Sequence, residues 1–394
     1  MMEKIRRVKT AVIGCGRISN IYIRNLKKLF YITDLVAVCD ISEEAAAHQA
    51  GFFGVDRVMT IDEIADSEEI ELVVNLTPPE AHYGIIRRML LAGKHVFTEK
   101  MMTTDLTKAQ ELVSLARERK LYLGSAPDTI LGAGLQSARW YLDSGVIGDI
   151  TSVQVCINRD QVLNSEMSAI IRQEGGALPY DVGIYYIGAL IMLLGPVASL
   201  TASGALAPVH PAEYFFRSEP DEQWQIPGYN ILAAALDFES GVIGSVLFDG
   251  NTVNCEQHRF AVFGTRGILL LGDPNTFNGS VTLLLPNNEK TVLPFTHGYN
   301  GKNMADEPRA FDGYGNRGVG AAEMAWAIRT GRHNNRCSME YGLHCMEVLL
   351  GMDRSAGTGE KITTTARFAI DPLRPGYYSE GARGRGDAER SLME

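Results

Sequence analysis

The sequence lacks the features that mark several classes of protein. No apolar run approaches the roughly 18 residues that a membrane-spanning helix needs, and no secretory leader precedes the first apolar segment. Basic residues are outnumbered, with 37 Lys and Arg against 47 Asp and Glu and a net charge of −10. Because no basic block offsets this charge, we expect neither a nucleic-acid nor a membrane partner. The expected location is the cytoplasm.

Cysteine is also scarce. The six cysteines contain no Cys-x-x-Cys pair, and several lie inside apolar runs typical of strands. Reduced thiols in a cytoplasm fit this distribution better than disulfides do. His344 and Cys345 are neighbours on a predicted helix and would point in different directions, so we predict no metal site.

A glycine-containing turn lies near the start of the chain, in VKTAVIGCGRISN at residues 8–20. The apolar run 10–13 leads into Gly14 and Gly16, and apolar residues at helical spacing follow at once. A strand, a tight turn and a helix in this order direct free backbone N–H groups at a diphosphate. Ser19 stands where the dinucleotide fingerprint usually has a third Gly or Ala, so the motif needs support from its surroundings.

That support comes from Asp40, which ends the second apolar run, 35–39, and lies 26 residues after Gly14. A carboxylate at the end of the second strand can accept both ribose hydroxyls of NAD and repels a 2′-phosphate. The neighbours Ile41 and Ser42 offer no cation for that phosphate. We therefore predict NAD and not NADP, against the alternative of an ordinary βαβ unit with a chance acid.

Other polar residues follow later strands of the same pattern, where ligands bind in parallel sheets. Thr77 and Pro78 follow the strand 71–75, and His82 in the next helical turn could reach the cofactor or cap the helix. The strand 95–98 leads to Glu99 and Lys100. The predicted cofactor contacts are Gly14, Gly16, Arg17, Ile18, Asp40, Thr77, Pro78, His82, Glu99 and Lys100.

Beyond residue 125 the pattern changes to short β-rich runs separated by Gly, Asn, Asp or Pro, which predicts a mainly antiparallel sheet. These runs are 150–158, 229–238, 242–248, 259–263, 268–271, 281–285 and 291–293. Predicted helices are 135–145, 179–194, 320–330 and 339–356.

The predicted fold class is therefore α/β, with an N-terminal Rossmann domain followed by a C-terminal α/β domain with a mainly antiparallel open sheet. Two domains also suit a chain of 394 residues. We place the NAD-binding domain at 1–125 and the substrate-binding and oligomerisation domain at 126–378. The polar, glycine-rich end, 379–394, is predicted to be a flexible tail.

Several motifs together resemble the glucose–fructose oxidoreductase, inositol dehydrogenase and rhizopine-catabolism family, often written Gfo/Idh/MocA. They are the GCGRIS turn, Asp40, NLTPPEAH, the Glu99-Lys100 pair, EGGALPYDVGIYY and RGVGAAEMAWAI. The resemblance implies an open sheet that forms oligomer contacts, and hence a homo-oligomer (dimer, tetramer or higher). It also implies that Lys100 matches the lysine of the family's EKP motif, with Met101 in place of proline.

The family's later motif has an acid followed four residues on by His or Tyr. Asp181 and Tyr185 match these positions, so the chain resembles the tyrosine branch. On a helix this spacing places both side chains on one face. We predict that Tyr185, assisted by Lys100, exchanges the alcohol proton and that Asp181 orients the hydroxyl; the roles of Tyr185 and Lys100 could be swapped.

Two pKa shifts are expected with this arrangement. The Lys100 ammonium should lower the pKa of Tyr185 from about 10, and burial should lower the pKa of Lys100. The structural alternative makes Lys100 a surface residue and makes Asp181 and Tyr185 a helix cap and a packed aromatic. The resemblance favours the catalytic interpretation.

Asp128, Asn158 and Arg159 are predicted substrate contacts, although such polar residues are more often solvated loop residues. The leading hypothesis is an NAD-dependent oxidoreductase that transfers a hydride between nicotinamide and a secondary alcohol, or hemiacetal carbon, of a sugar, polyol or glycoside. The alternatives are an NAD-dependent glycosidase that oxidises and eliminates transiently, or a noncatalytic NAD or sugar sensor.

Overall fold

The first part of the chain forms a six-stranded parallel sheet in the order β3-β2-β1-β4-β5-β6. In this computed structural model, the described residues are 5–211, 223–253, 257–301, 313–331, 335–365 and 367–375. The sheet and its helices are β1 (Val8–Ile13), α1 (Ser19–Lys28), β2 (Thr33–Cys39), α2 (Glu43–Phe53), β3 (Arg57–Val58), α3 (Ile61–Asp66), β4 (Leu72–Asn75), α4 (Pro79–Leu91), β5 (His95–Thr98), α5 (Leu106–Glu118) and β6 (Leu123–Ser125).

Apolar strands and local caps explain these elements. The central strands β1 and β4 are almost wholly buried, as expected for a parallel sheet covered on both faces. Ser42 accepts a hydrogen bond from the Ala45 N–H at the start of α2, and Asp105 caps α5 in the same way. The helix α5 therefore begins at Leu106, directly after its cap Asp105.

The second part of the chain contains a nine-stranded sheet in the order β16-β15-β14-β13-β7-β12-β11-β8-β17. Every neighbouring pair is antiparallel except the parallel pair of β7 and β12. Its strands are β7 (Ile150–Asn158), β8 (Val197–Leu206), β11 (Tyr229–Phe238), β12 (Ile243–Asp249), β13 (Gln257–Gly264), β14 (Ile268–Leu271), β15 (Val281–Leu284), β16 (Lys290–Leu293) and β17 (Ile362–Thr363). The predicted fold class is confirmed.

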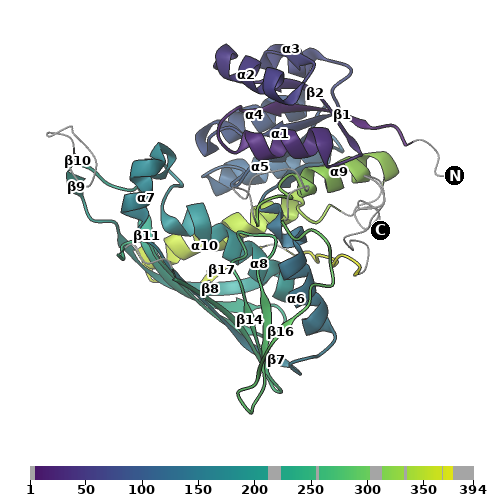
Figure 1. The fold of residues 1–394 in the computed structure, drawn as a ribbon. Helices are drawn as coiled ribbons and strands as arrows, with labels where there is room; N and C mark the ends of the chain where they lie inside the picture. The colour runs from purple at the N-terminus through teal and green to yellow at the C-terminus, as the bar shows by residue number, and fades with distance from the viewer. Residues whose placement is uncertain are drawn as a thin grey trace.

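Helices cover one face of this sheet (Figure 1). The helices of this half of the protein are α6 (Ala133–Asp143), α7 (Gln161–Met167), α8 (Ile184–Leu194), α9 (Val319–Thr330) and α10 (Met339–Thr358). Short helical turns lie at Asp128–Leu131, Ala169–Arg172 and Pro179–Gly183, and two short strands are β9 (His210–Pro211) and β10 (Gln223–Trp224). Residues alternate between buried and exposed along β12, which leaves Ile243 and Leu247 on the open face.

The late helix α9 lies beside the first sheet and not beside the second (Figure 1). Arg329 donates to a Glu71 carboxylate oxygen at 2.8 Å and to the Arg7 carbonyl at 2.9 Å. Asn25 of α1 donates to the Arg317 carbonyl at 2.6 Å, just before α9 begins. The chain thus returns to the nucleotide-binding half, and the division at residue 125 stays a prediction.

The ten-residue strand β8 was absent from the prediction. β8 reads VASLTASGAL, and its Ala, Ser and Gly residues resemble a loop more than a strand. It forms because β11 pairs with it from Leu206 to Val197 and because α10 packs on it. Tertiary pairing here outweighs a weak local preference.

Several predictions concern features that the described residues test only in part. The predicted tail, 379–394, and Cys255 lie outside the described residues. The other five cysteines form no disulfide. No helix in the described ranges is long and apolar enough to cross a membrane, and no group of three or more His, Cys, Asp or Glu side chains within them is placed to hold a metal ion.

Candidate active site

The glycine turn between β1 and α1 has the geometry of a phosphate-binding loop. Gly14 has φ of +102°, and a Cβ there would lie 2.7 Å from the carbonyl carbon of Leu76. A Cβ on Gly16 would meet nothing within 4 Å. The Ser19 hydroxyl donates to the Gly16 carbonyl at 2.6 Å, and no side chain caps the start of α1. The Ser19 N–H donates to the Gly16 carbonyl at 3.0 Å, and the next N–H groups of the first turn, which no side chain caps, are open to an anion.

Arg17 and Ile18 are exposed beside this turn, and Asp40 reaches toward it from the end of β2. The Asp40 carboxylate accepts hydrogen bonds from the N–H groups of Cys15 at 2.7 Å and Ser42 at 2.9 Å. These bonds hold the carboxylate at the edge where a ribose would lie. The turn and the acid together fit a dinucleotide with an unphosphorylated ribose.

Thr77 and Pro78 lie at the same sheet edge, where Thr77 is half-buried and Pro78 is exposed. The side chain of His82 is not exposed at this edge. His82 is fully buried, with its two ring nitrogens against the carbonyl oxygens of Thr77 and Met101. The ring of His82 ties together two loops, and its contact with the cofactor stays a prediction. Burial lowers the pKa of His82.

Glu99 is also largely enclosed. One of its oxygens accepts from the Tyr22 hydroxyl at 2.7 Å and the other from the Lys100 backbone N–H at 3.1 Å. Glu99 therefore supports the loop that carries Lys100. The peptide bond between Lys100 and Met101 is cis.

Lys100 and Asp181 form the centre of the site. The Lys100 ammonium donates to the Asp181 carbonyl at 2.6 Å and to its carboxylate oxygen Oδ1 at 3.0 Å. The predicted helix 179–194 begins as a π-helical turn, Pro179–Gly183, before α8. Asp181 and Tyr185 therefore do not share one regular α-helix as predicted. Both nevertheless face the Lys100 ammonium, which contacts Asp181 and the ring of Tyr185.

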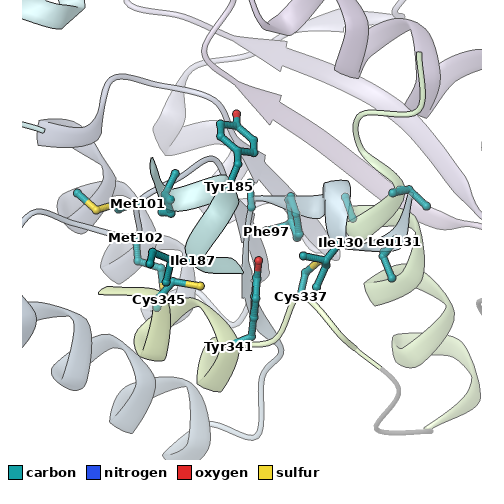
Figure 2. Close-up of a cluster of buried hydrophobic side chains, with 14 of the residues drawn as sticks. Phe97, Met101, Met102, Ile130, Leu131, Tyr185, Ile187, Cys337, Tyr341 and Cys345 are labelled. Atoms are coloured by element: carbon teal, nitrogen blue, oxygen red, sulfur yellow. The ribbon is translucent and has the colours of Figure 1, made fainter. Parts of the chain in front are cut away.

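Tyr185 lies 5.6 Å from the Lys100 Nζ, measured to the ring centroid. Figure 2 shows its ring at the edge of a buried cluster that includes Phe97 and Tyr341, with its hydroxyl directed away from Tyr341. Among the described residues, no protein group forms a hydrogen bond with that hydroxyl. It is therefore available for a substrate.

The two expected pKa shifts at this pair are wrong in direction. Burial raises the pKa of Tyr185 above its ordinary value, although Arg317 and Lys100 act to lower it. Burial acts to lower the pKa of Lys100, but the Asp181 carboxylate, with Tyr185 and Glu99, outweighs it and raises that pKa. The prediction considered one effect on each residue. In the site, the carboxylate partner of Lys100 outweighs the effect of its burial, and the desolvation of Tyr185 outweighs the effect of the nearby cations.

Gln161, at the start of α7, is a site residue that the prediction missed. Its amide donates to the Asp181 carboxylate oxygen Oδ2 at 3.2 Å and to the Gly176 carbonyl at 3.1 Å. The preceding Asn158 and Arg159 are half-buried at the end of β7. Lys100, Gln161 and the nearby charge of Arg159 lower the pKa of Asp181 even though burial raises it.

Asp128 is not exposed to a substrate. Its side chain has no exposed surface, and one carboxylate oxygen accepts from the N–H groups of Gly318 at 2.7 Å and Gly320 at 3.3 Å. The other oxygen lies 3.7 Å from Arg317 Nη1. Asp128 holds the start of α9 and faces Arg317, and its contact with a substrate stays a prediction. Burial raises the pKa of Asp128 to about 6 although Arg317 acts to lower it.

Comparisons with known proteins agree with this geometry. Residues 8–126 match the family described as oxidoreductase family, NAD-binding Rossmann fold, and residues 135–270 match the GFO/IDH/MocA C-terminal domain. The two matches cover more than half of the chain. The chain belongs to the Gfo/Idh/MocA oxidoreductase family.

Similar proteins are known from sequence and structure. An oxidoreductase of Schizosaccharomyces pombe is 27% identical over 67% of this chain and 70% of its own length. Inositol 2-dehydrogenase of Rhizobium meliloti is 29% identical over 50% of this chain and 59% of its own. A levoglucosan dehydrogenase in complex with NADH and L-sorbose has a TM-score of 0.75, at 17% identity, over 91% of this chain and 99% of the other.

The comparisons confirm the predicted family, fold class, oxidoreductase activity and NAD cofactor. The assignment to the tyrosine branch and the roles of individual site residues stay predictions.

Proposed function

We propose that this protein oxidises or reduces a secondary alcohol of a sugar, polyol or glycoside with NAD, and that Lys100, Asp181 and Tyr185 carry the reaction. The observation that supports this most is the contact of Lys100 with both Asp181 and Tyr185 at the edge of the nucleotide-binding sheet. The names of the inositol and levoglucosan dehydrogenases support the class of substrate.

The residues divide the chemistry between them. NAD, when bound, accepts the hydride from the carbinol carbon. Tyr185, as the phenolate, takes the hydroxyl proton on its oxygen, and the Lys100 ammonium stabilises that phenolate before the transfer. Asp181, held by Lys100 and Gln161, accepts a hydrogen bond from a substrate hydroxyl and so orients the carbinol.

We further propose a cytoplasmic homo-oligomer that uses the open face of the nine-stranded sheet as its contact. Ile243 and Leu247 are exposed on that face, which is the kind of apolar surface that a second copy would bury. The five unbonded cysteines support a reducing compartment.

A direct test identifies the nucleotide that copurifies and then screens sugars, polyols and glycosides for growth of NADH absorbance. Net NADH formation with a free sugar or polyol supports the proposal. Glycoside cleavage without net NADH would instead support the glycosidase, and sugar binding without turnover of either kind would support a sensor. Because a tightly held cofactor gives little free NADH, the screen includes pairs of an alcohol and a carbonyl sugar.

Asp40→Asn should weaken NAD binding about 10- to 100-fold, because a neutral amide replaces a charged acceptor for the ribose hydroxyls. It should also reduce the preference for NAD over NADP, since the repulsion of a 2′-phosphate is lost. Fluorescence titration of both nucleotides measures the two dissociation constants.

The matched control for Asp40→Asn is Asp34→Asn. Asp34 lies near the start of β2, the strand that Asp40 follows, and pairs with Lys9 at 2.8 Å. NAD affinity should not change in this control. An Asp40→Asn protein that binds NAD as tightly as the wild type, or wild-type protein that copurifies with NADP, would contradict the assigned role of Asp40.

A further inference from the structure

Arg317 is a buried cation that the proposed chemistry has not yet used. Only 2% of the residue is exposed, and its guanidinium carbon lies over the Tyr185 ring at 5.0 Å from the centroid. This is closer than the Lys100 ammonium at 5.6 Å. Two cations from distant parts of the chain therefore lie against the same phenol.

Several contacts hold Arg317 in this place. Its Nη2 donates to the Asn275 side-chain oxygen at 2.8 Å and to the Asn275 carbonyl at 3.1 Å, while Asn25 binds the Arg317 backbone carbonyl. Asp128 lies 3.7 Å from Nη1, too far for a hydrogen bond. Within the described residues, Nε and Nη1 of Arg317 and Oδ1 of Asp128 have no hydrogen-bond partner.

The incomplete pairing matters for Tyr185. A buried guanidinium whose partner makes a full bidentate pair would have most of its charge neutralised nearby. Here the Asp128 carboxylate lies too far from Arg317 for such a pair. More of the positive charge of Arg317 therefore acts on the Tyr185 phenol. Lys100 differs, because its ammonium is bonded directly to the Asp181 carboxylate.

We propose that Arg317 is a positioning residue of the reaction, which stabilises the phenolate form of Tyr185 so that this oxygen can take the alcohol proton. The negative charge of Asp128 determines how strongly the positive charge of Arg317 stabilises the Tyr185 phenolate. In this step the substrate O–H bond breaks and the Tyr185 O–H bond forms; the carbinol C–H bond breaks as the C=O bond forms, and bound NAD would supply the hydride acceptor. The inference rests on the proposed role of Tyr185.

The charged groups around Tyr185 come from four parts of the chain. Lys100 and Glu99 follow β5, Asp181 lies in the π-helical turn, and Arg317 precedes α9 with Asp128 behind it. Burial raises the pKa of Tyr185, and of the cations that oppose this, Arg317 has the larger effect and Lys100 the smaller. Loss of Arg317 should therefore raise the pKa of Tyr185 further.

The test titrates the Tyr185 phenol directly, in full-length protein with NAD present. Tyrosine labelled with ¹³C at the ring carbon that bears the hydroxyl gives one NMR signal for each of the 15 tyrosines, and the signal missing in Tyr185→Phe identifies Tyr185. In Arg317→Met its titration should move to higher pH by about 1 unit or more, the usual effect of losing an adjacent opposite charge. Arg317→Lys should stay close to the wild type.

Asp128→Asn provides a second variant with the opposite sign. An Asn oxygen can still accept from Gly318 and Gly320, but the negative charge behind Arg317 is gone, so the Tyr185 titration should move to lower pH. The matched structural control is Arg336→Met, which removes another buried arginine from a buried carboxylate, that of Glu323. It should lower the stability without moving the Tyr185 signal.

The proposal is overturned if Tyr185 titrates at the same pH in Arg317→Met and wild type, or if the Asp128→Asn shift has the same sign as that of Arg317→Met. It is also overturned if the wild-type signal stays protonated up to the pH of unfolding. These results need no sugar turnover. A failed sugar screen alone would therefore count against the proposed function and not against the coupling of Arg317 to Tyr185.

Discussion

Tyr185→Phe should lower kcat for alcohol oxidation by about 10²- to 10⁴-fold, the range that a positioned acid or base contributes. The variant removes only the hydroxyl, which makes no hydrogen bond within the described protein. The residue is 7% exposed and its ring packs at the edge of the cluster in Figure 2, so phenylalanine should keep the packing. Steady-state NADH formation gives the rate, and NAD affinity should stay close to that of the wild type.

The neighbouring Tyr186→Phe is a matched control for this effect. Tyr186 is fully buried against the rings of Phe248 and Phe260, and its hydroxyl is outside the proposed chemistry. Its kcat should remain close to the wild-type value. Lys100→Met then separates the two roles: a small loss in Tyr185→Phe with a large loss in Lys100→Met would show that Lys100 exchanges the proton.

The nucleotide half of the site was predictable because its residues are set by local order. In a parallel sheet each strand ends at the same edge, so Asp40, Thr77 and Lys100 could be placed together from the positions of the strands alone. The residues next to them along the chain were enough to predict these positions. The same logic does not predict the burial of His82, because burial between two loops depends on the path of both.

The other half of the site depends on contacts between distant segments. Arg317 and Gln161 reach Tyr185 and Asp181 from the start of α9 and of α7, and no spacing in the sequence relates these segments. The motif RGVGAAEMAWAI identified the family but not the direction of its first side chain. The signs of the pKa shifts were missed for the same reason, because desolvation depends on everything that surrounds a group.

Gly14→Ala should cost about 2 to 5 kcal/mol of folding free energy, since two penalties combine. The backbone has φ of +102°, and the new Cβ would lie 2.7 to 2.8 Å from backbone atoms of Leu76 and Thr77. Relief requires movement of the loop after β4, which also carries Pro78. Urea unfolding should show the loss of stability, and the remaining folded protein should bind NAD poorly.

Gly16→Ala distinguishes folding from binding at the same turn. Its φ is not positive, and its Cβ would have nothing within 4 Å, so the free energy of unfolding should change little. Because the diphosphate is expected to approach the backbone here, the added methyl should weaken NAD binding about tenfold or more. Equal loss of stability in both variants would mean that the turn is only a packing feature. A stable Gly14→Ala protein with normal NAD affinity would mean that the loop at Leu76 moves freely, and that close contact between β1 and β4 does not shape the binding site.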